Sequence, residues 1–204
     1  MKLYYSETLM PRKACAVARH LRSPVDFVHV DLAAGEHRMP AYLALNPNAK
    51  VPLLVEDGEP LWESNAIMCR LAMLAGSDLW PADRRQADIL RWLSWDGEHF
   101  TRHAGTLYFE HLIRPRLGMG PPDGETVLGA TRGFRQSAAI LERHLGRRDW
   151  LVGDRPTVAD FALAVALPYA PDARIPLADF PAIDRWHDRL GTLDGWWEPF
   201  PGRG

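Results

Sequence analysis

The sequence has little cysteine and no long apolar run. Its two cysteines, Cys15 and Cys69, form neither a C-x-x-C motif nor a spacing typical of metal ligands. No apolar stretch approaches the roughly 18 residues of a membrane-spanning helix, and the first residues do not follow a secretory signal pattern. We therefore expect a protein of a reducing, cytoplasmic compartment, without a disulfide framework, a metal site or a membrane partner.

An excess of charge of either sign is also missing. Lysine and arginine number 24 against 26 aspartates and glutamates, so the formal net charge at pH 7 is −2. This balance provides no general attraction for nucleic acid, and we expect no nucleic-acid partner. The length of 204 residues and the apolar fraction of 47% suit a globular protein with one large hydrophobic core or two small ones.

The first 76 residues mix strand and helix patterns. The expected order is strand 2–5, helix 11–21, strand 25–32, helix 39–45, strands 51–55 and 60–62, and a helix that Ser64 caps. Asp57-Gly58, between the last two strands, is a hairpin signal. The pattern predicts a βαβ unit, a connecting helix and a ββα unit.

Strand signals end after this half of the chain. The remaining pattern is helical, over 83–104, 124–145, 157–168 and 179–190. Thr157 and Asp160 predict a capping box before the third of these helices, and we interpret both residues as structural. We expect an α/β domain over 1–76, a linker over 77–82 and an all-helical domain over 83–204. Residues 195–201 are too aromatic for a free tail, and we expect them to fold back over the domain.

Three motifs occur in order along the chain. Residues 46–54 read Asn-Pro-Asn-Ala-Lys-Val-Pro-Leu-Leu, residues 63–67 read Glu-Ser-Asn-Ala-Ile, and residues 151–160 read Leu-Val-Gly-Asp-Arg-Pro-Thr-Val-Ala-Asp. Together they resemble the cytosolic glutathione transferases, with bacterial, theta- or nu-like members as the expected class. The resemblance covers nearly the whole chain. It implies a thioredoxin-like amino-terminal domain that binds glutathione, followed by the family's all-helical domain.

The resemblance assigns the first motif to glutathione binding. In this family the Val51–Pro52 bond is cis, and Val51 offers its N–H and C=O groups to the cysteinyl backbone of glutathione in a strand-like pairing. Lys50 and His37 are candidates for the glycine end of the ligand. The alternative interpretations are an ordinary proline at a strand edge and two solvated side chains.

The second motif is assigned to the other end of glutathione. A helix N-terminus carries free N–H groups and partial positive charge, which favour a carboxylate. The family places the γ-glutamyl carboxylate on the serine that corresponds to Ser64, while the residue at Glu63 helps to hold the same end. Ser64 as a simple helix cap is the alternative, and the two roles are compatible.

The first loop is expected to hold the catalytic group. A single donor near the sulfur of glutathione lowers the pKa of the thiol and so favours the reactive thiolate. Counting back from residues 11–13 (Pro-Arg-Lys) places Thr8 on the catalytic hydroxyl of relatives that read Thr-Pro-Asn. Leu9 and Met10 depart from that pattern. Because Met10 replaces an asparagine that can donate to the sulfur, weakened transferase activity is predicted.

Other residues of the loop region remain alternatives for the contact with sulfur. Ser6 is nearer the end of the first strand, and Tyr5 precedes it. Cys15 and Cys69 are interpreted as helix packing, because buried free cysteine usually behaves as a small hydrophobe.

The resemblance also implies a site for the electrophile beside the first long helix. Trp92, Trp95, His99 and Arg102 recur three or four residues apart and so share a helix face. Such a face suits a small hydrophobic or anionic electrophile. The alternative is that the tryptophans pack between domains and the histidines face solvent. The predicted electrophile site consists of Met10, Trp95, His99, Arg102, His103 and Tyr108.

These residues predict a glutathione-dependent transferase that acts on small electrophiles, with glutathione as cosubstrate. A glutathione-dependent disulfide reductase is one alternative. A non-catalytic interaction protein with the same fold is another, and the methionine at position 10 is its main support. A keto-diacid isomerase is disfavoured, because the Ser-Ser-Cys loop motif of such relatives is absent. By analogy with the family, we expect a two-fold homodimer.

Overall fold

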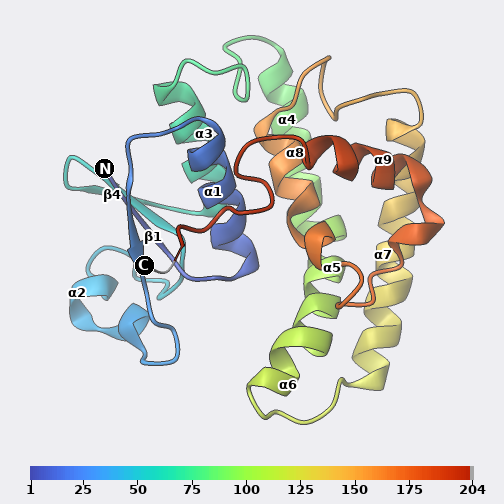
Figure 1. Ribbon diagram of the computed structural model, residues 1–204, viewed down its shortest axis with the longest axis horizontal. Coiled ribbons are helices and arrows are strands. Elements are labelled where there is room, and N and C mark those ends of the chain that lie inside the picture. Colours follow the sequence, from blue (N-terminus) through green and yellow to red (C-terminus); the bar gives the residue numbers. More distant parts are fainter. Residues whose placement is uncertain (203–204) are drawn as a thin grey trace. The chain divides into compact units, whose positions relative to one another are not determined.

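Residues 1–202 are described by a computed structural model, and they divide into two compact units (Figure 1). The first unit comprises Met1–Trp80 together with the end of the chain from Leu193, and the second comprises Pro81–Thr192. The boundary lies within the predicted linker, 77–82. The end of the chain falls within the helical domain that the sequence predicts, but its contacts group it with the first unit.

The first unit is built on a four-stranded sheet in the order β2-β1-β3-β4. Strand β1 pairs in parallel with β2 and antiparallel with β3, and β3 pairs antiparallel with β4. The turn of the last hairpin has positive φ at Asp57 and Gly58, as the hairpin signal predicts. The strands are β1 (Lys2–Tyr5), β2 (Asp26–His29), β3 (Leu53–Glu56) and β4 (Glu59–Trp62).

Strand β3 begins later than predicted. The sequence pattern predicts a strand from Val51, but ladder pairing starts at Leu53. Pro52 has no N–H group to donate to a neighbouring strand, so the ladder begins after it.

Helices cover the sheet from both faces. They are α1 (Leu9–His20), the short 3₁₀ segment η1 (Glu36–Arg38), α2 (Pro40–Leu43) and α3 (Ser64–Leu74). Tyr4 and Leu53 are paired and lie on one face, where Tyr42 of α2 packs against Leu53 and Tyr4. Leu3 and Leu54 point to the opposite face and are fully buried, and α1 and α3 pack together and contact the sheet. This arrangement confirms the predicted thioredoxin-like domain.

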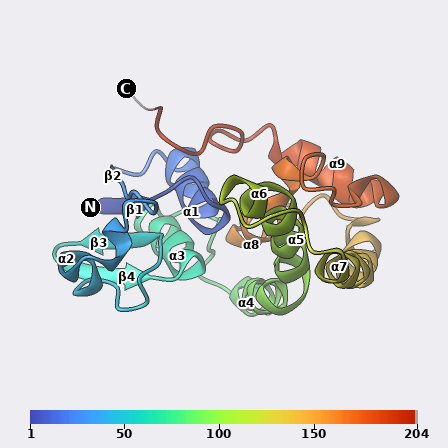
Figure 2. The same cartoon turned by 90° about the horizontal axis from the view of Figure 1, so that it is seen from below.

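The second unit is all-helical, as predicted. Two π-helical segments, Asp96–Phe100 and Phe109–Ile113, join the first three helices into one continuous stretch. The helix predicted over 83–104 therefore continues to Arg116, with local widening rather than a break. Helix α5 packs along α7 (Figure 2). The helices are α4 (Arg85–Trp95), α5 (Thr101–Tyr108), α6 (Arg114–Arg116), α7 (Gly124–Leu145), α8 (Val158–Leu163) and α9 (Pro181–Leu190).

The predicted capping box at the start of α8 is confirmed. Asp160 is fully buried and accepts hydrogen bonds from the Thr157 N–H at 2.7 Å, the Leu151 N–H at 3.0 Å and the Trp186 Nε1–H at 2.9 Å. Burial raises the pKa of this carboxyl, and the hydrogen bonds oppose that rise. Asp160 thus ties three segments of the second unit together.

None of the helices within residues 1–202 combines the length and the apolar character that crossing a bilayer demands.

Candidate functional site

A cavity of about 240 Å³ opens in the first unit beside the start of α3. It is lined by Met10, Asn46, Asn48, Lys50, Val51, Pro52, Trp62, Glu63 and Ser64. Five of these residues are predicted from the sequence to bind glutathione, namely Lys50, Val51, Pro52, Glu63 and Ser64, whereas Met10 is predicted for the electrophile site. The fold brings them together because the β3–β4 hairpin pairs Leu53 with Trp62, which places the two motifs side by side.

One part of the cavity lining is the loop over residues 46–51, whose backbone is fixed by side-chain hydrogen bonds. The buried Asn46 donates from Nδ2 to the Lys50 carbonyl at 2.8 Å, and its Oδ1 accepts from the Asn48 N–H at 3.1 Å. Tyr42 Oη donates to the same Lys50 carbonyl at 2.7 Å. Burial raises the pKa of Tyr42 to about 12, so the phenol stays a neutral donor at physiological pH. These contacts fix the backbone just before Val51.

The next residues line the cavity directly. The Val51–Pro52 peptide bond is cis. Val51 is half-buried and Pro52 is buried, whereas Lys50 is exposed at the same wall. A lysine ammonium at this position can attract an anionic group of a ligand that lies along Val51.

Another part of the cavity lining is the start of α3. Ser64 is buried, and its hydroxyl contacts the thioether sulfur of Met10 at 3.9 Å. Glu63 has φ 72° and ψ 113°, in the positive-φ region that non-glycine residues rarely adopt. The first turn of this 11-residue helix presents free N–H groups with partial positive charge, which suit a carboxylate. A methionine sulfur is only a weak acceptor, so an anion can replace it at the serine hydroxyl.

Thr8 lies at the N-cap position of α1, next to this cavity in sequence but outside its lining. Its backbone is fixed, because its N–H donates to the Ser6 carbonyl at 2.7 Å and its carbonyl accepts from the Arg12 N–H at 3.0 Å. The Thr8 side chain makes no capping hydrogen bond within the described residues. The half-buried hydroxyl is therefore not engaged as a helix cap.

The two alternatives to Thr8 are more enclosed. Ser6 is 8% exposed and Tyr5 is 4% exposed. The Tyr5 ring lies edge-on to Phe27 and His29 and stacks on Phe200. These contacts give Tyr5 a packing role in the first unit.

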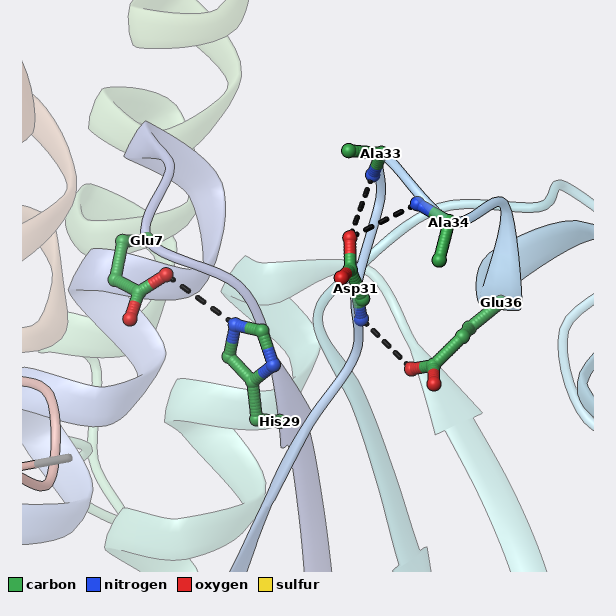
Figure 3. A network of polar contacts seen from close by, with 6 residues as sticks. All are labelled: Glu7, His29, Asp31, Ala33, Ala34 and Glu36. Atoms are coloured by element: carbon green, nitrogen blue, oxygen red, sulfur yellow. Dashed lines mark hydrogen bonds and ion pairs between the residues drawn. The ribbon is translucent and has the colours of Figure 1, made fainter. Parts of the chain in front are cut away.

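His37 lies in η1, outside the lining of the cavity. The loop before it is held by Asp31, whose Oδ1 accepts from the Ala33 and Ala34 N–H groups at 2.8 and 2.9 Å (Figure 3). Glu36 in turn accepts from the Asp31 N–H at 2.7 Å. The Nδ1 atom of His37 is buried, with no hydrogen-bond partner found in residues 1–202. Its predicted role at the glycine end of glutathione stays a prediction.

A second contact in Figure 3 joins the first loop to the end of β2. Nε2 of His29 lies 3.3 Å from Oε2 of Glu7, with both side chains more than a third exposed. A polar contact this exposed contributes little to stability. It does place a titratable side chain beside the residue that precedes Thr8.

Both cysteines are free thiols with packing roles. Cys15 is fully buried, and burial raises its pKa to about 12. Burial also raises the pKa of Cys69 to about 12. Neither side chain provides a thiolate near neutral pH.

The predicted electrophile residues of the second unit have different surroundings. Trp95 is half-buried, 5.7 Å from the ring of His99, and lines a cavity of about 310 Å³ with Arg91, Trp92, Ile140 and His144. Arg102 is exposed and forms an ion pair with Glu98 at 3.8 Å. Within the second unit, the described contacts do not gather the predicted residues around one cavity.

His103 and Tyr108 pack inside the second unit. A Cβ atom added at Gly133 of α7 would lie 2.3 Å from the His103 ring, so the ring packs closely on that glycine. Partial burial, with Arg102 and His99 nearby, lowers the pKa of His103. Tyr108 is buried, with its ring 5.0 Å from Tyr169. Their assignment to an electrophile site stays a prediction.

Three lining residues are not predicted from the sequence: Asn46, Asn48 and Trp62. Both asparagines belong to the first motif, residues 46–54, and short polar side chains in a turn are a signal for local hydrogen bonds to the backbone. Trp62 ends β4 and is exposed at the cavity rim. In the part of the chain that the structure describes, no group of three or more His, Cys, Asp or Glu side chains is arranged to hold a metal ion.

Comparison with known proteins gives matches along both units. Residues 1–72 match the model of the "Glutathione S-transferase, N-terminal domain" family, and residues 125–189 match "Glutathione S-transferase, C-terminal domain". Glutathione S-transferase 3 of Zea mays is 37% identical over 174 residues, which cover 82% of this chain and 78% of the maize protein. The Disulfide-bond oxidoreductase YfcG of Escherichia coli (strain K12) is 27% identical, covering 92% of this chain and 88% of that protein.

The fold comparison agrees with these relatives. A solved structure of glutathione S-transferase III in apo form aligns with a TM-score of 0.86 and 31% identity, covering 100% of this chain and 99% of that chain. The relatives include plant and bacterial proteins, and the predicted bacterial, theta- or nu-like class stays a prediction.

Proposed function

Since the chain belongs to the cytosolic glutathione transferase family, we propose that it transfers glutathione to small hydrophobic or anionic electrophiles, with the Thr8 hydroxyl stabilising the thiolate. The observation that carries the proposal is the cavity beside α3. Its lining combines a helix N-terminus, the backbone just before β3 and a lysine. We also propose that the protein works as a homodimer, by analogy with the family.

The cavity suits an extended tripeptide with charged ends. The γ-glutamyl carboxylate binds the N–H and hydroxyl of Ser64, where it replaces the weak contact with Met10. The cysteinyl backbone pairs with Val51 as an added strand. The glycine carboxylate lies toward Lys50, with His37 as a further donor.

The chemical step requires a thiolate at neutral pH. The Thr8 hydroxyl donates a hydrogen bond to the sulfur and so lowers the pKa of the thiol from its ordinary value of about 8.5. The sulfur then forms a bond to the electrophilic carbon. In a substitution that carbon loses its leaving group, and in an addition to an activated double bond the neighbouring carbon gains a proton from water.

Ser64→Ala tests the binding part of the proposal. Loss of the hydroxyl removes a hydrogen bond to a carboxylate, so the dissociation constant of glutathione should rise by roughly tenfold or more. Calorimetric titration at a fixed pH measures this change. The matched control is Asn65→Ala on the same helix turn, which should bind as the wild type does. If Ser64→Ala binds glutathione as tightly as the wild type does, the γ-glutamyl carboxylate does not bind at this helix end.

A second candidate function is glutathione-dependent reduction of disulfides, which the similarity to the E. coli oxidoreductase favours. In this reaction the bound thiolate attacks one sulfur of the substrate and expels the other as a thiol. A second glutathione thiolate then attacks the glutathione sulfur of the mixed disulfide, which gives oxidised glutathione and releases the remaining substrate sulfur as a thiol. This reaction is measured by adding glutathione reductase, which consumes NADPH as it reduces the oxidised glutathione. Conjugation of glutathione to an aromatic halide consumes no NADPH.

Met10→Asn tests whether the methionine limits the chemistry. An amide N–H can donate to the sulfur where the thioether cannot, so the pKa of bound glutathione should fall by about one unit, the size expected for one hydrogen bond to a charged acceptor. Thiolate absorbance against pH measures the shift. Met10→Leu removes the sulfur without adding a donor and serves as the control. If Met10→Asn and Met10→Leu titrate alike, position 10 does not contact the sulfur.

A further inference from the structure

The last part of the first unit is a segment without helix or strand, residues 193–200, which we name the strap. It runs beside α1 in both ribbon views (Figure 1, Figure 2). Trp196 is fully buried although it lies within eight residues of the chain's end. Residues 195–201 are expected from the sequence to fold back over the domain, and the strap contacts α1 and β1.

The strap is fixed at the far end of α1, away from the first loop. Arg19 donates from Nε to the Pro199 carbonyl at 2.9 Å and from its guanidinium to the Phe200 carbonyl at 3.0 Å. Gly195 has φ +76°, and a Cβ atom there would lie 2.5 Å from Cβ of Arg19 and 3.1 Å from the Ala16 carbonyl. Only glycine fits this close approach, so the backbone of the strap lies directly on the helix.

The strap also contacts one residue on each side of the first loop, Tyr5 at the end of β1 and Arg12 in the first turn of α1. The Phe200 ring stacks on Tyr5 at 5.7 Å between centroids and 16° between planes. The Arg12 guanidinium donates to the Trp196 carbonyl and lies 5.3 Å from the centre of the Trp196 ring. Tyr5 ends β1 just before the loop, and the Arg12 N–H donates to the Thr8 carbonyl just after it.

We infer that the strap is a positioning element that holds the Thr8 hydroxyl in place through Tyr5 on one side of the loop and Arg12 on the other. The inference rests on the proposed function, in which Thr8 donates to the sulfur of glutathione. Loops are more mobile than the elements that they connect, and a displacement of about 1 Å at a catalytic group can reduce the rate by about a hundredfold. The strap restrains the loop from outside the glutathione cavity, so it acts on the sulfur rather than on ligand binding.

Two variants loosen the strap in different places. Phe200→Ala removes the stacking on Tyr5, and Gly195→Ala pushes the strap off α1 without deleting any side chain. Trp197→Ala is the matched control, because Trp197 lies in the same segment and is 55% exposed. A melting curve for each variant establishes that it is folded before the other measurements.

Hydrogen exchange of the backbone amides tests the inference without any ligand. The amides of Thr8 and Arg12 should exchange about tenfold faster in Phe200→Ala and Gly195→Ala than in the wild type, as expected for local opening. The amides of α3 should exchange at the wild-type rate, and Trp197→Ala should change neither region. Unchanged exchange at residues 6–12 in both strap variants would overturn the inference, whether or not the protein binds glutathione.

The second readout is the titration of bound glutathione, in the full-length protein. Both strap variants should raise the midpoint of the thiolate titration by about half a unit or more, while the dissociation constant of glutathione stays within about twofold of the wild type. If Thr8→Ala shifts the midpoint and the strap variants do not, the inference fails and the proposed function stands. If the wild type does not bind glutathione, the proposed function fails, and the exchange rates alone decide whether the strap positions the loop.

Discussion

Replacing Thr8 by alanine should raise the pKa of the thiol of bound glutathione by about one to two units. A hydrogen bond to a charged group contributes about 1.5–3 kcal/mol, and each pKa unit corresponds to about 1.4 kcal/mol. At pH 7 the thiolate fraction, and with it kcat/KM, should fall by roughly ten- to thirtyfold, because a thiol with a pKa of about 8.5 is still about 3% ionised at that pH. Thiolate absorbance against pH, with glutathione at saturation, measures the shift directly.

The same substitution should leave stability and binding nearly unchanged. The Thr8 side chain makes no capping hydrogen bond within residues 1–202, so alanine removes no cap from α1. Thr8 also lies outside the lining of the cavity beside α3, so the dissociation constant of glutathione should stay close to that of the wild type. Thr8→Ser keeps the hydroxyl and should keep the low pKa.

Ser6 and Tyr5 are the alternatives to Thr8 as the donor to the sulfur, and substitutions at these positions distinguish them from Thr8. Ser6 and Tyr5 are buried, and Tyr5 packs against three rings. Ser6→Ala and Tyr5→Phe should therefore titrate like the wild type. A wild-type titration for Thr8→Ala together with a raised pKa for Ser6→Ala would transfer the catalytic role to Ser6.

Replacing Asp160 by alanine should lower the free energy of unfolding by about 3 kcal/mol or more. The substitution leaves the buried N–H groups of Leu151, Thr157 and Trp186 without their acceptor, and each unsatisfied buried donor costs about 1–3 kcal/mol. It also removes the capping box of α8. Urea denaturation followed by tryptophan fluorescence measures the loss.

Asp154→Ala is the matched control for this prediction. Asp154 is exposed in the same connection, between Leu151 and the start of α8. It should unfold at nearly the wild-type urea concentration, since exposed substitutions of this kind change stability by less than about 0.5 kcal/mol. Equal destabilisation by the two variants would show that the carboxylate of Asp160 is not the link between these segments.

Much of the lining of the cavity beside α3 was predictable because its residues are close in sequence. Residues 50–52 and 63–64 flank a short hairpin, and a short hairpin leaves little freedom in strand register. Pairing Leu53 with Trp62 then brings the two motifs to one edge of the sheet. The late start of β3 follows from the missing N–H of Pro52.

Contacts over long sequence separations could not be predicted in this way. The strap binds α1 largely through backbone carbonyls of Trp196, Pro199 and Phe200, and a carbonyl gives no sequence signal for its partner. The position of His103 depends on Gly133, on another helix, where the absence of a side chain admits the ring. Helical periodicity alone cannot show whether the His103 side chain packs against another helix or is exposed to solvent.

The most direct measurement of the central claim is a crystal structure of the protein grown with millimolar glutathione. We predict the γ-glutamyl carboxylate at the N–H and hydroxyl of Ser64, the cysteinyl backbone along Val51, and the sulfur nearest the Thr8 Oγ1 atom. Glutathione bound elsewhere, or no glutathione in the cavity beside α3 at that concentration, would contradict the account.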